Sequence, residues 1–427
     1  MAAILSRPLT RLAAMAVSGS SARVATNTLS VDEALERILA RVKVLAPVSM
    51  ELLDALGTTL AEDIVADRDV PPFDNSAMDG YAVRGADVMR VPVKLKVTGA
   101  IAAGDPPWGS VGAGEAMRIM TGAPMPELAD TIVRVEDTDN GTDMVMINVR
   151  TKYGTSVRPA GEDLKQGETI LRTGTVLRPA EIGVLATLGR TSVRVVPRPR
   201  VAVVSTGDEL VELDAPIEPG QIRDANRYSL ASAARAMGAT PVPLGIVRDT
   251  ADDLRSALRD AASKADVIVT SGGVSVGDHD HVKPVVDELG SMDFWSIAIR
   301  PGRPLAFGAI GGTLIFGLPG NPVSSLLGFE LFVRPALLKM AGRTLLHRPR
   351  VTATFDDKLD TPPGLRFFAR GIYDPATKTV RTTGPQGSGI LRSMALANSF
   401  IEVPENVDHL DRGATVTVIR TDLPEDH

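Results

Sequence analysis

The sequence predicts a multidomain α/β protein with a central α/β domain, an inserted β domain, a discontinuous helical domain and a C-terminal β domain. Strand and helix patterns alternate after residue 197, which is typical of a mostly parallel sheet covered by helices. Two other stretches, one on each side, hold short alternating strands between Gly and Pro turns. The length of 427 residues allows roughly three domains or more.

The folded part is expected to begin at Ser30. Ser30 and Glu33 form a capping-box pattern, followed by apolar residues at helical spacing. A second helix is expected over 179–188, because proline is favoured in a first helical turn. Between the two helices lie alternating strands such as 93–97 and 131–135. The β domain is therefore predicted to be inserted into an N-terminal helical unit.

The α/β domain follows a Pro-Arg-Pro linker at 197–199. Its predicted strands are 201–205, 241–247 and 266–270, and its predicted helices are 226–237, 252–263, 281–289 and 323–340. Ligands of such sheets bind beyond the carboxyl ends of the strands. Strands return after residue 350, for example 366–372 and 415–419, and indicate a C-terminal β domain.

These patterns give predicted domain boundaries. They are a disordered leader at 1–29, a discontinuous N-terminal domain at 30–68 and 164–197, an inserted β domain at 69–163, an α/β domain at 198–345 and a C-terminal β domain at 346–427.

Composition limits the function. The net charge of −6 gives no general attraction for nucleic acid or an anionic membrane, so an anionic ligand needs a locally basic pocket. The absence of cysteine excludes disulfides, thiolate metal sites and a cysteine nucleophile, and it fits a cytoplasmic location. No apolar run of about 18 residues is present, so no membrane-spanning helix is expected.

The leader at 1–29 has a composition of its own. It carries Arg7, Arg11 and Arg23, several serines and no acid, as mitochondrial transit peptides do. A disordered leader or an early start codon accounts for the same composition.

Two predicted strands end in polar, glycine-bearing turns, at 205–209 and 271–278. Gly272 and Gly273 allow backbone N–H groups to approach an anion, and Ser271 and Ser275 add hydroxyl donors. The turn at 271–278 is therefore a candidate phosphate or oxyanion cradle. An ordinary strand-to-helix turn has the same pattern.

Two further segments could bind an anion. Arg300 and Arg303 lie on a chain stiffened by prolines, and arginine forks match oxyanions in a bidentate manner. The segment 317–324 precedes a predicted helix and places Pro322 near its first turn, with free amides toward any anion. A solvated turn and simple helix initiation are the alternatives.

Carboxylates could supply a cation site. Acids near phosphates usually imply a hard cation such as Mg²⁺. Capped turns or surface charges are the alternative for each of them. The candidates are Asp74, Asp79, Asp163, Glu209, Asp249 and Asp280.

The segment 273–277 also matches the G-x-S-x-G pattern of serine hydrolases, with acids and histidines following it. A hydrolase that uses Ser275 as nucleophile is the rival interpretation. It leaves Arg300, Arg303 and the first domain without roles.

Together these segments resemble the MoeA family, which also includes the E domain of gephyrin. The resemblance runs in order along roughly residues 30–420. It rests on eight motifs: 72–84 (PFDNSAMDGYAVR), 118–126 (RIMTGAPMP), 158–163 (RPAGED), 205–210 (STGDEL), 271–278 (SGGVSVGD), 300–304 (RPGRP), 317–324 (GLPGNPVS) and 387–388 (GS).

The resemblance implies an elongated homodimer whose α/β domain is like the pterin-adenylylating enzymes. It also implies an active site between the α/β and C-terminal domains, reached by the inserted domain of the partner. The implied catalytic residues are Asp79, Glu209, Asp249 and Asp280, the last three being candidate metal ligands. The implied substrate-binding residues are Thr121, Asp163, Ser271, Ser275, Arg300, Arg303, Pro304, Pro319, Pro322, Ser324, Arg366, Arg370 and Ser388. Among them, Arg300, Arg303, Ser324 and either Arg366 or Arg370 would face molybdate.

The implied reaction takes adenylylated molybdopterin and molybdate, cleaves the phosphoanhydride with Mg²⁺, and releases AMP and the molybdenum-loaded pterin. The upstream adenylyltransferase is the expected partner. Ser296 and Arg300 stand where many relatives carry lysine, and Ser296 removes one charge. A non-catalytic scaffold, as in gephyrin, is the remaining alternative.

Overall fold

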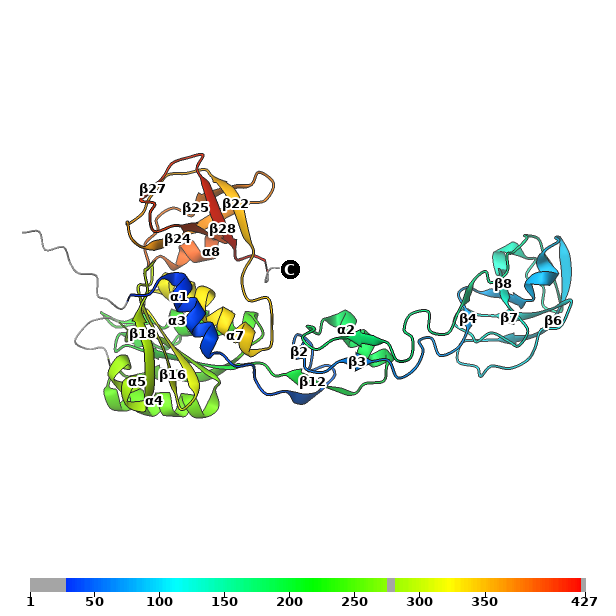
Figure 1. The fold of residues 1–427 in the computed structure, drawn as a ribbon, viewed down its shortest axis with the longest axis horizontal. Coiled ribbons are helices and arrows are strands. Elements are labelled where there is room, and N and C mark those ends of the chain that lie inside the picture. The colour runs from blue at the N-terminus through cyan, green and yellow to red at the C-terminus, as the bar shows by residue number, and fades with distance from the viewer. Residues whose placement is uncertain (1–27, 275–280, 424–427) are drawn as a thin grey trace, which may run out of the picture.

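The computed structural model describes residues 28–274 and 281–423. The predicted leader, Ser275 and Asp280 lie outside these residues, apart from the leader's last two positions. The molecule is elongated, with two stacked modules at one end, a narrow middle segment and a distal lobe at the other end (Figure 1).

Helix α1 (Val31–Arg41) begins where the capping-box pattern predicts a helix. The Ser30 hydroxyl accepts from the Glu33 amide, and the Glu33 carboxylate accepts from the Ser30 amide, so both halves of the capping box are present. The helix buries Ala34 and Ile38 in the same apolar core as the α/β module. Helix α1 therefore packs with the α/β module and not with the middle segment.

The middle segment is built from two passes of the chain. Its elements are β1 (Val48–Glu51), β2 (Thr59–Leu60), β3 (Ile64–Val65), β11 (Thr169–Leu171), α2 (Pro179–Thr187) and β12 (Ser192–Val196). They form a β1-β12-β2 sheet and a β11-β3 pair around Leu60, Leu185 and Val195. Helix α2 was predicted, whereas these short strands were not.

The distal lobe is a small β module, as the alternating pattern predicts. Its five-stranded sheet has the order β8-β5-β7-β6-β9. The lobe's elements are β4 (Asn75–Ser76), β5 (Gly80–Val83), η1 (Gly85–Val88), β6 (Val93–Ile101), β7 (Glu115–Ile119), β8 (Thr131–Arg134), η2 (Val135–Asp137), β9 (Met144–Ile147) and β10 (Val157–Arg158).

The α/β module contains a six-stranded sheet with the order β16-β13-β17-β21-β20-β18. The first four strands run parallel, and β20 and β18 continue the sheet antiparallel. The strands are β13 (Arg200–Thr206), β16 (Thr240–Val247), β17 (Val267–Ser271), β18 (Gly290–Ser296), β20 (Pro304–Ile310) and β21 (Thr313–Leu318). The antiparallel edge was not predicted.

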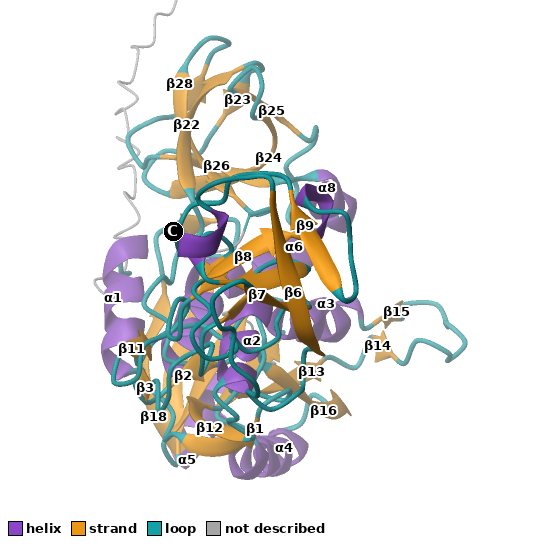
Figure 2. Ribbon diagram, turned by 90° about the vertical axis from the view of Figure 1, so that its right-hand side faces the viewer, coloured by secondary structure: helices purple, strands orange, loops and turns teal. Residues whose placement is uncertain are grey.

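Helices cover both faces of this sheet. One face packs on α1, α3 (Ala225–Ala236), α6 (Pro322–Gly328) and α7 (Arg334–Met340), and the other packs on α4 (Ala251–Lys264) and α5 (Val282–Leu289). The predicted single helix over 323–340 is divided by η3 (Phe329–Val333), which is π-helical. The short pair β14 (Leu210–Val211) and β15 (Ile222–Arg223) projects as an arm (Figure 2). No helix among residues 28–274 and 281–423 is long and apolar enough to cross a membrane.

The C-terminal β module lies against the α/β module. Its sheet has the order β19-β24-β25-β22-β28-β26, and β24 also pairs with β26, which closes the ring. Strand β19 comes from the α/β stretch of the chain, so the two modules share a sheet. The elements are β19 (Ile299–Arg300), β22 (Arg350–Phe355), β23 (Leu359–Asp360), β24 (Arg366–Asp374), β25 (Thr379–Thr382), α8 (Leu391–Leu396), β26 (Ser399–Val403), β27 (His409–Leu410) and β28 (Thr415–Arg420).

Candidate functional site

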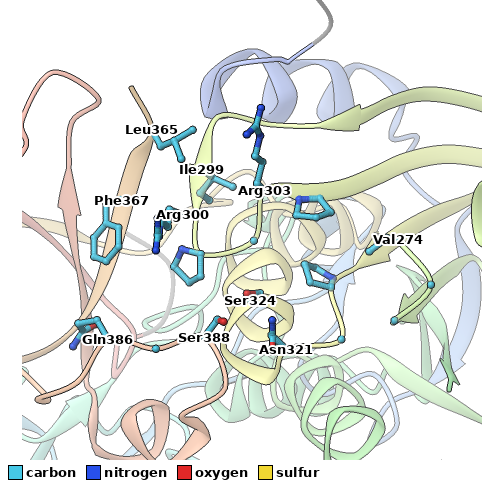
Figure 3. A pocket seen from close by; sticks show the side chains of 18 residues that line it. Val274, Ile299, Arg300, Arg303, Asn321, Ser324, Leu365, Phe367, Gln386 and Ser388 are labelled. Carbon is cyan, nitrogen blue, oxygen red and sulfur yellow. The ribbon is translucent and has the colours of Figure 1, made fainter. Parts of the chain in front are cut away.

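A cavity of about 720 Å³ lies between the α/β module and the C-terminal module (Figure 3). It is walled by loops at the carboxyl ends of β17 and β21, by the turn that leads into β20, and by the segment before α8. Six predicted substrate-binding residues line it: Arg300, Arg303, Pro304, Pro319, Ser324 and Ser388. The cavity also includes Gly272, Gly273, Asn321, Phe367, Gln386 and Gly387.

The turn after β17 requires its two glycines. Gly272 has φ +92°, and a Cβ there would lie 2.7 Å from the carbonyl oxygen of Thr206. Gly273 has φ +67°, and a Cβ there would lie 2.5 Å from the Val282 side chain. Both positions are in the left-handed region, which favours glycine. The backbone can therefore pass close to β13 and to any ligand in the cavity.

The turn that leads into β20 brings two cations to the cavity. Arg300 and Arg303 are both exposed, and neither guanidinium has a carboxylate partner among the described residues. In Figure 3 the Arg300 side chain lies beside Phe367, whereas Arg303 extends away from Ser324 and Ser388. The cavity wall thus carries positive charge that the described protein does not neutralise.

The first turn of α6 joins the cavity to the C-terminal module. Ser324 is buried and lines the cavity, and Pro322 occupies the first turn without lining it. The Val323 amide donates to the carbonyl oxygen of Ser388 at 3.1 Å. The sequence predicted that amides at this helix start are free to bind an anion. The Val323 amide is instead hydrogen-bonded to the loop that carries Ser388.

Arg370 supports the same loop from behind. It is completely buried, its Nε donates to Ser393 Oγ at 3.0 Å, and its Nη2 donates to the Gly387 carbonyl at 3.1 Å. Its Nη1 is buried and has no hydrogen-bond partner among the described residues. Burial lowers the pKa of Arg370 to about 10. A desolvated cation with an unsatisfied N–H therefore sits directly behind a wall of the cavity.

Arg366 has different surroundings, although it lies on the same strand. Its guanidinium pairs with Asp32 at 2.8 Å, with Glu405 at 3.0 Å and with Glu402 at 3.5 Å. These carboxylates raise its pKa, and the pairing with Arg366 lowers the pKa of Asp32. Arg366 does not line the cavity, and its charge is already neutralised. It ties the C-terminal module to the first turn of α1.

The predicted acids Glu209 and Asp249 gather near the end of β13 but do not line the cavity. Asp249 Oδ1 accepts from Thr206 Oγ1 at 3.2 Å, and the Glu209 carboxylate lies 2.6 Å from where a Cβ of Gly207 would stand. Among the described residues, no group of three His, Cys, Asp or Glu side chains could hold a metal ion. The third predicted ligand, Asp280, lies outside those residues.

The remaining predicted residues lie away from the cavity. Asp79 and Thr121 are in the distal lobe, where Asp79 Oδ1 accepts from the Thr121 amide at 2.7 Å and from its hydroxyl at 2.8 Å. These bonds lower the pKa of Asp79. Asp163 is exposed between β10 and β11, and its amide donates to Val70. One chain does not bring these residues together with the cavity (Figure 1).

The sequence pattern did not single out two polar residues near the site, Asn226 and Gln386. Asn226, in the first turn of α3, donates from Nδ2 to Ser271 Oγ at 2.8 Å and to the Gly320 carbonyl at 2.6 Å. Ser271 itself is 3% exposed and does not line the cavity. Gln386 lines the cavity and accepts from the Arg370 amide at 2.8 Å. Neither residue type in isolation signals a site, because exposed amides are common.

The arrangement can bind tetrahedral or phosphorylated anions. Unpaired guanidinium groups, glycine-rich backbone and hydroxyl side chains converge on one cavity, and such groups hold oxyanions through charge-assisted hydrogen bonds. Thr206 connects a carboxylate to the cavity wall. Its hydroxyl donates to Asp249, and its carbonyl oxygen lies close to Gly272, which lines the cavity. The described part of the cavity lining contains no histidine that could act as the base for a serine nucleophile.

Three family models match the chain in order. They are the MoeA N-terminal region (domain I and II) over 29–189, the probable molybdopterin binding domain over 202–339, and the MoeA C-terminal region (domain IV) over 352–420.

Relatives match nearly the whole chain. A molybdopterin molybdenumtransferase 2 of Mycobacterium tuberculosis is 40% identical over 402 residues, covering 91% of this chain and 98% of the relative. A molybdopterin molybdenumtransferase of Haemophilus influenzae is 36% identical, with coverages of 91% and 98%. The crystal structure of a molybdopterin biosynthesis MoeA protein of Pyrococcus horikoshii superimposes with a TM-score of 0.79 at 34% identity, covering 92% of this chain and 99% of that one. These matches do not favour the serine-hydrolase and scaffold alternatives.

Proposed function

Because the chain belongs to the MoeA family of molybdopterin molybdenumtransferases, we propose that it inserts molybdate into adenylylated molybdopterin and releases AMP. This is a transferase reaction of molybdenum cofactor biosynthesis and its last common step. A cytoplasmic location and a contact with the upstream adenylyltransferase, both expected from the sequence, belong to the same proposal.

The uncompensated positive charge of the cavity is the observation that carries this proposal. The chain as a whole has a net charge of −6, yet Arg300 and Arg303 line the cavity without a counter-ion among the described residues. Arg370 adds a buried guanidinium whose Nη1 is unsatisfied. A buried cation without a partner is costly, so an anionic ligand would lower the free energy of this arrangement. The two substrates, molybdate and the adenylylated pterin, are both anions.

The residues at the end of β13 fit a divalent cation as partial ligands. Mg²⁺ is commonly held by one or two carboxylates together with substrate phosphates. Asp249 and Glu209 would provide those carboxylates, and Asp280 would be a third. Bound there, the cation would neutralise charge on the phosphoanhydride and polarise it.

The protein's own groups orient the substrates. Arg300 would hold molybdate through a bidentate fork, and the hydroxyls of Ser324 and Ser388, which line the same cavity, would add hydrogen bonds. The glycine turn at 272–273 would let backbone amides approach the phosphate, and Phe367 and Pro319 would exclude water on their sides. Catalysis by positioning and charge neutralisation needs no protein nucleophile.

We further propose that the active molecule is a homodimer with shared sites. Asp79, Thr121 and Asp163 lie far along the molecule from the cavity of their own chain (Figure 1). A second copy could bring its distal lobe to this cavity. That arrangement would assign these residues to the partner's site.

A reconstituted insertion assay tests the function. Purified protein is mixed with adenylylated molybdopterin, Mg²⁺ and molybdate, and AMP release is measured. We expect AMP release that requires molybdate and stops when the divalent cation is chelated. Sulfate, which has the same tetrahedral shape and charge, is the matched control. No AMP release at any molybdate concentration, with the pterin demonstrably bound, would overturn the proposal.

A further inference from the structure

One end of the cavity presents hydrogen-bond donors. This oxyanion end consists of five residues that all line the cavity: Arg300, Ser324, Gln386, Gly387 and Ser388. The Arg300 guanidinium and the backbone amides of Gly387 and Ser388 donate to no described residue. Figure 3 shows Arg300, Gln386 and Ser388 on one side of the cavity and Val274 on the other. The donors of the oxyanion end are therefore available to a ligand.

The acceptors at the oxyanion end are occupied by the protein itself. The Gly387 carbonyl accepts from Arg370 Nη2 at 3.1 Å, and the Ser388 carbonyl accepts from the Val323 amide at 3.1 Å. Gln386 Oε1 accepts from the Arg370 amide at 2.8 Å. No aspartate, glutamate or histidine is among the described residues that line the cavity. The oxyanion end is therefore rich in donors and poor in acceptors.

Tetrahedral oxyanions differ in what they require of such a site. Molybdate and sulfate are dianions at neutral pH, and every oxygen of each anion can only accept a hydrogen bond. Hydrogenphosphate has the same charge and shape, but one of its oxygens carries a proton that needs an acceptor. The phosphoanhydride of adenylylated molybdopterin carries no such proton. Both proposed substrates therefore match a site that is made of donors.

We propose that the oxyanion end selects fully deprotonated anions and rejects hydrogenphosphate, because its described residues offer no free acceptor for the proton. The hydroxyls of Ser324 and Ser388 do not remove this restriction. A hydroxyl that accepts from an oxygen cannot also donate to it, so the serine loses its own hydrogen bond to the anion. A proton directed at Arg300 is also repelled by the charge of the guanidinium. The inference rests on the proposed function, since it defines which anions the molybdate subsite accepts.

Calorimetric titration of the purified protein tests this selection without turnover. The probes are sulfate, phosphate and monofluorophosphate, each titrated above the second pKa of phosphate, where all three are dianions. Monofluorophosphate has fluorine in place of the hydroxyl of hydrogenphosphate, so it lacks the proton. We expect it to bind within about threefold of sulfate and phosphate to bind at least about tenfold more weakly, the scale of one unsatisfied polar group. Equal binding of phosphate and sulfate, or of phosphate and monofluorophosphate, would overturn the proposal, and so would the absence of any binding.

Ser388→Asp places an acceptor at the oxyanion end and should reduce the preference. The introduced carboxylate weakens the binding of every dianion by repulsion, but it can accept the proton of hydrogenphosphate. The ratio of sulfate affinity to phosphate affinity should therefore fall by about fivefold or more, the gain of one satisfied hydrogen bond. Ser49→Asp makes the same change at an exposed position of β1 and should keep the wild-type ratio. An unchanged ratio in a folded Ser388→Asp variant would contradict the inference.

Further controls separate the possible failures. Thermal melting checks folding, and the three probes on wild type decide the question if Ser388→Asp does not fold. Molybdate should displace each bound anion, and Arg300→Ala should weaken the binding of each. Anions that stay bound in both controls occupy another site, and the inference then fails. If wild type releases no AMP but keeps the preference for unprotonated anions, only the proposed function has failed. If wild type releases AMP and phosphate binds as well as sulfate, only the present inference has failed.

Discussion

At the scale of single residues, the cavity depends on guanidinium groups with contrasting surroundings. Arg300 is exposed and unpaired among the described residues, Arg370 is desolvated, and Arg366 is neutralised by three carboxylates. Only a cation without a protein partner can gain a charge-assisted bond when an anion arrives. Arg300 and Arg303 share this property, but Arg303 extends away from Ser324 and Ser388 (Figure 3), so Arg300 is the group whose loss should affect oxyanion binding most directly.

Replacing Arg300 by alanine should raise the molybdate concentration for half-maximal AMP release. The loss of a charge-assisted hydrogen bond, about 1.5–3 kcal/mol, corresponds to roughly ten- to a hundredfold. The maximal rate should recover at high molybdate. Arg381→Ala, at an exposed position of β25, removes the same charge outside the cavity and should leave the titration unchanged. An unchanged half-saturation in Arg300→Ala would remove this residue from the oxyanion site.

Gly272 and Gly104 provide a matched pair for testing the turn after β17. Both have φ +92°, but a Cβ at Gly272 would lie 2.7 Å from the Thr206 carbonyl, whereas Gly104 has open space around it. Gly104→Ala should cost about 1 kcal/mol of unfolding free energy, from the left-handed backbone alone. Gly272→Ala should cost more and should also reduce AMP release. Equal losses in denaturant titrations would show that the contact with Thr206 does not constrain the turn.

The roles of Arg366 and Arg370 could not be separated in the sequence. They stand four residues apart on one strand, so strand alternation places both on the same face of the sheet. Their partners are distant in sequence and differ. Arg366 pairs with Asp32 at the start of α1, whereas Arg370 donates to Ser393 and Gly387 after β25. Asn226 was missed for the same reason, since its acceptors Ser271 and Gly320 lie 45 and 94 positions away.

At the scale of elements, local patterns predicted most helices and three of the four parallel strands of the α/β sheet, but not β21. The capping box of α1 and the proline that begins α2 are local signals, and the structure confirms both elements. The pairing of β19 with β24 joins residues 299–300 to 366–367, and no local signal marks so short a strand. The π-helical turn η3 was also not predictable, because an apolar run such as FELFV fits an ordinary helix equally well.

The β23–β27 pair at the edge of the C-terminal module should be sensitive to pH. His409 Nδ1 contacts Asp360 at 2.5 Å and Nε2 contacts Asp411 at 3.2 Å. Both carboxylates favour the protonated imidazole and so raise the pKa of His409. The stabilisation should be complete below the unfolded pKa of about 6.5 and should be lost as pH rises through the higher folded pKa. His409→Gln should therefore lower Tm at about pH 5.5 and have little effect at about pH 9. A difference that grows with pH would contradict this sign.

At the scale of the whole molecule, the distance between the distal lobe and the cavity leads to a complementation test. One variant carries Asp79→Asn and Thr121→Ala in the lobe, and the other carries Arg300→Ala in the cavity. If each site combines one chain's cavity with the other chain's lobe, a mixed dimer contains one intact site of two. Random mixing makes half of the dimers mixed, so about a quarter of the wild-type sites should be restored.

Each variant alone provides the baseline for that experiment, measured at low molybdate, where the loss of Arg300 is most severe. A different result is that the activity of the re-associated mixture equals only the mean of the two variants' activities. That result would mean that each cavity works with the lobe of its own chain, or without any lobe. Light scattering on the same samples establishes that dimers are present.

The shared sheet of the two stacked modules has a consequence for recombination between relatives. Strand β19 pairs with β24, Arg366 pairs with Asp32, and Phe368, Phe400 and Ile419 belong to the same apolar core as α1 and the α/β strands. A chimera that exchanges residues from 350 onward would set a foreign β24 against a native β19 and divide this core between two parents. In the sequence, the segment 341–349 looks like a suitable crossover point between domains. The tolerated crossover points should instead be the two chain passes that enter the distal lobe, because the apolar cores of the middle segment and of the distal lobe are separate there.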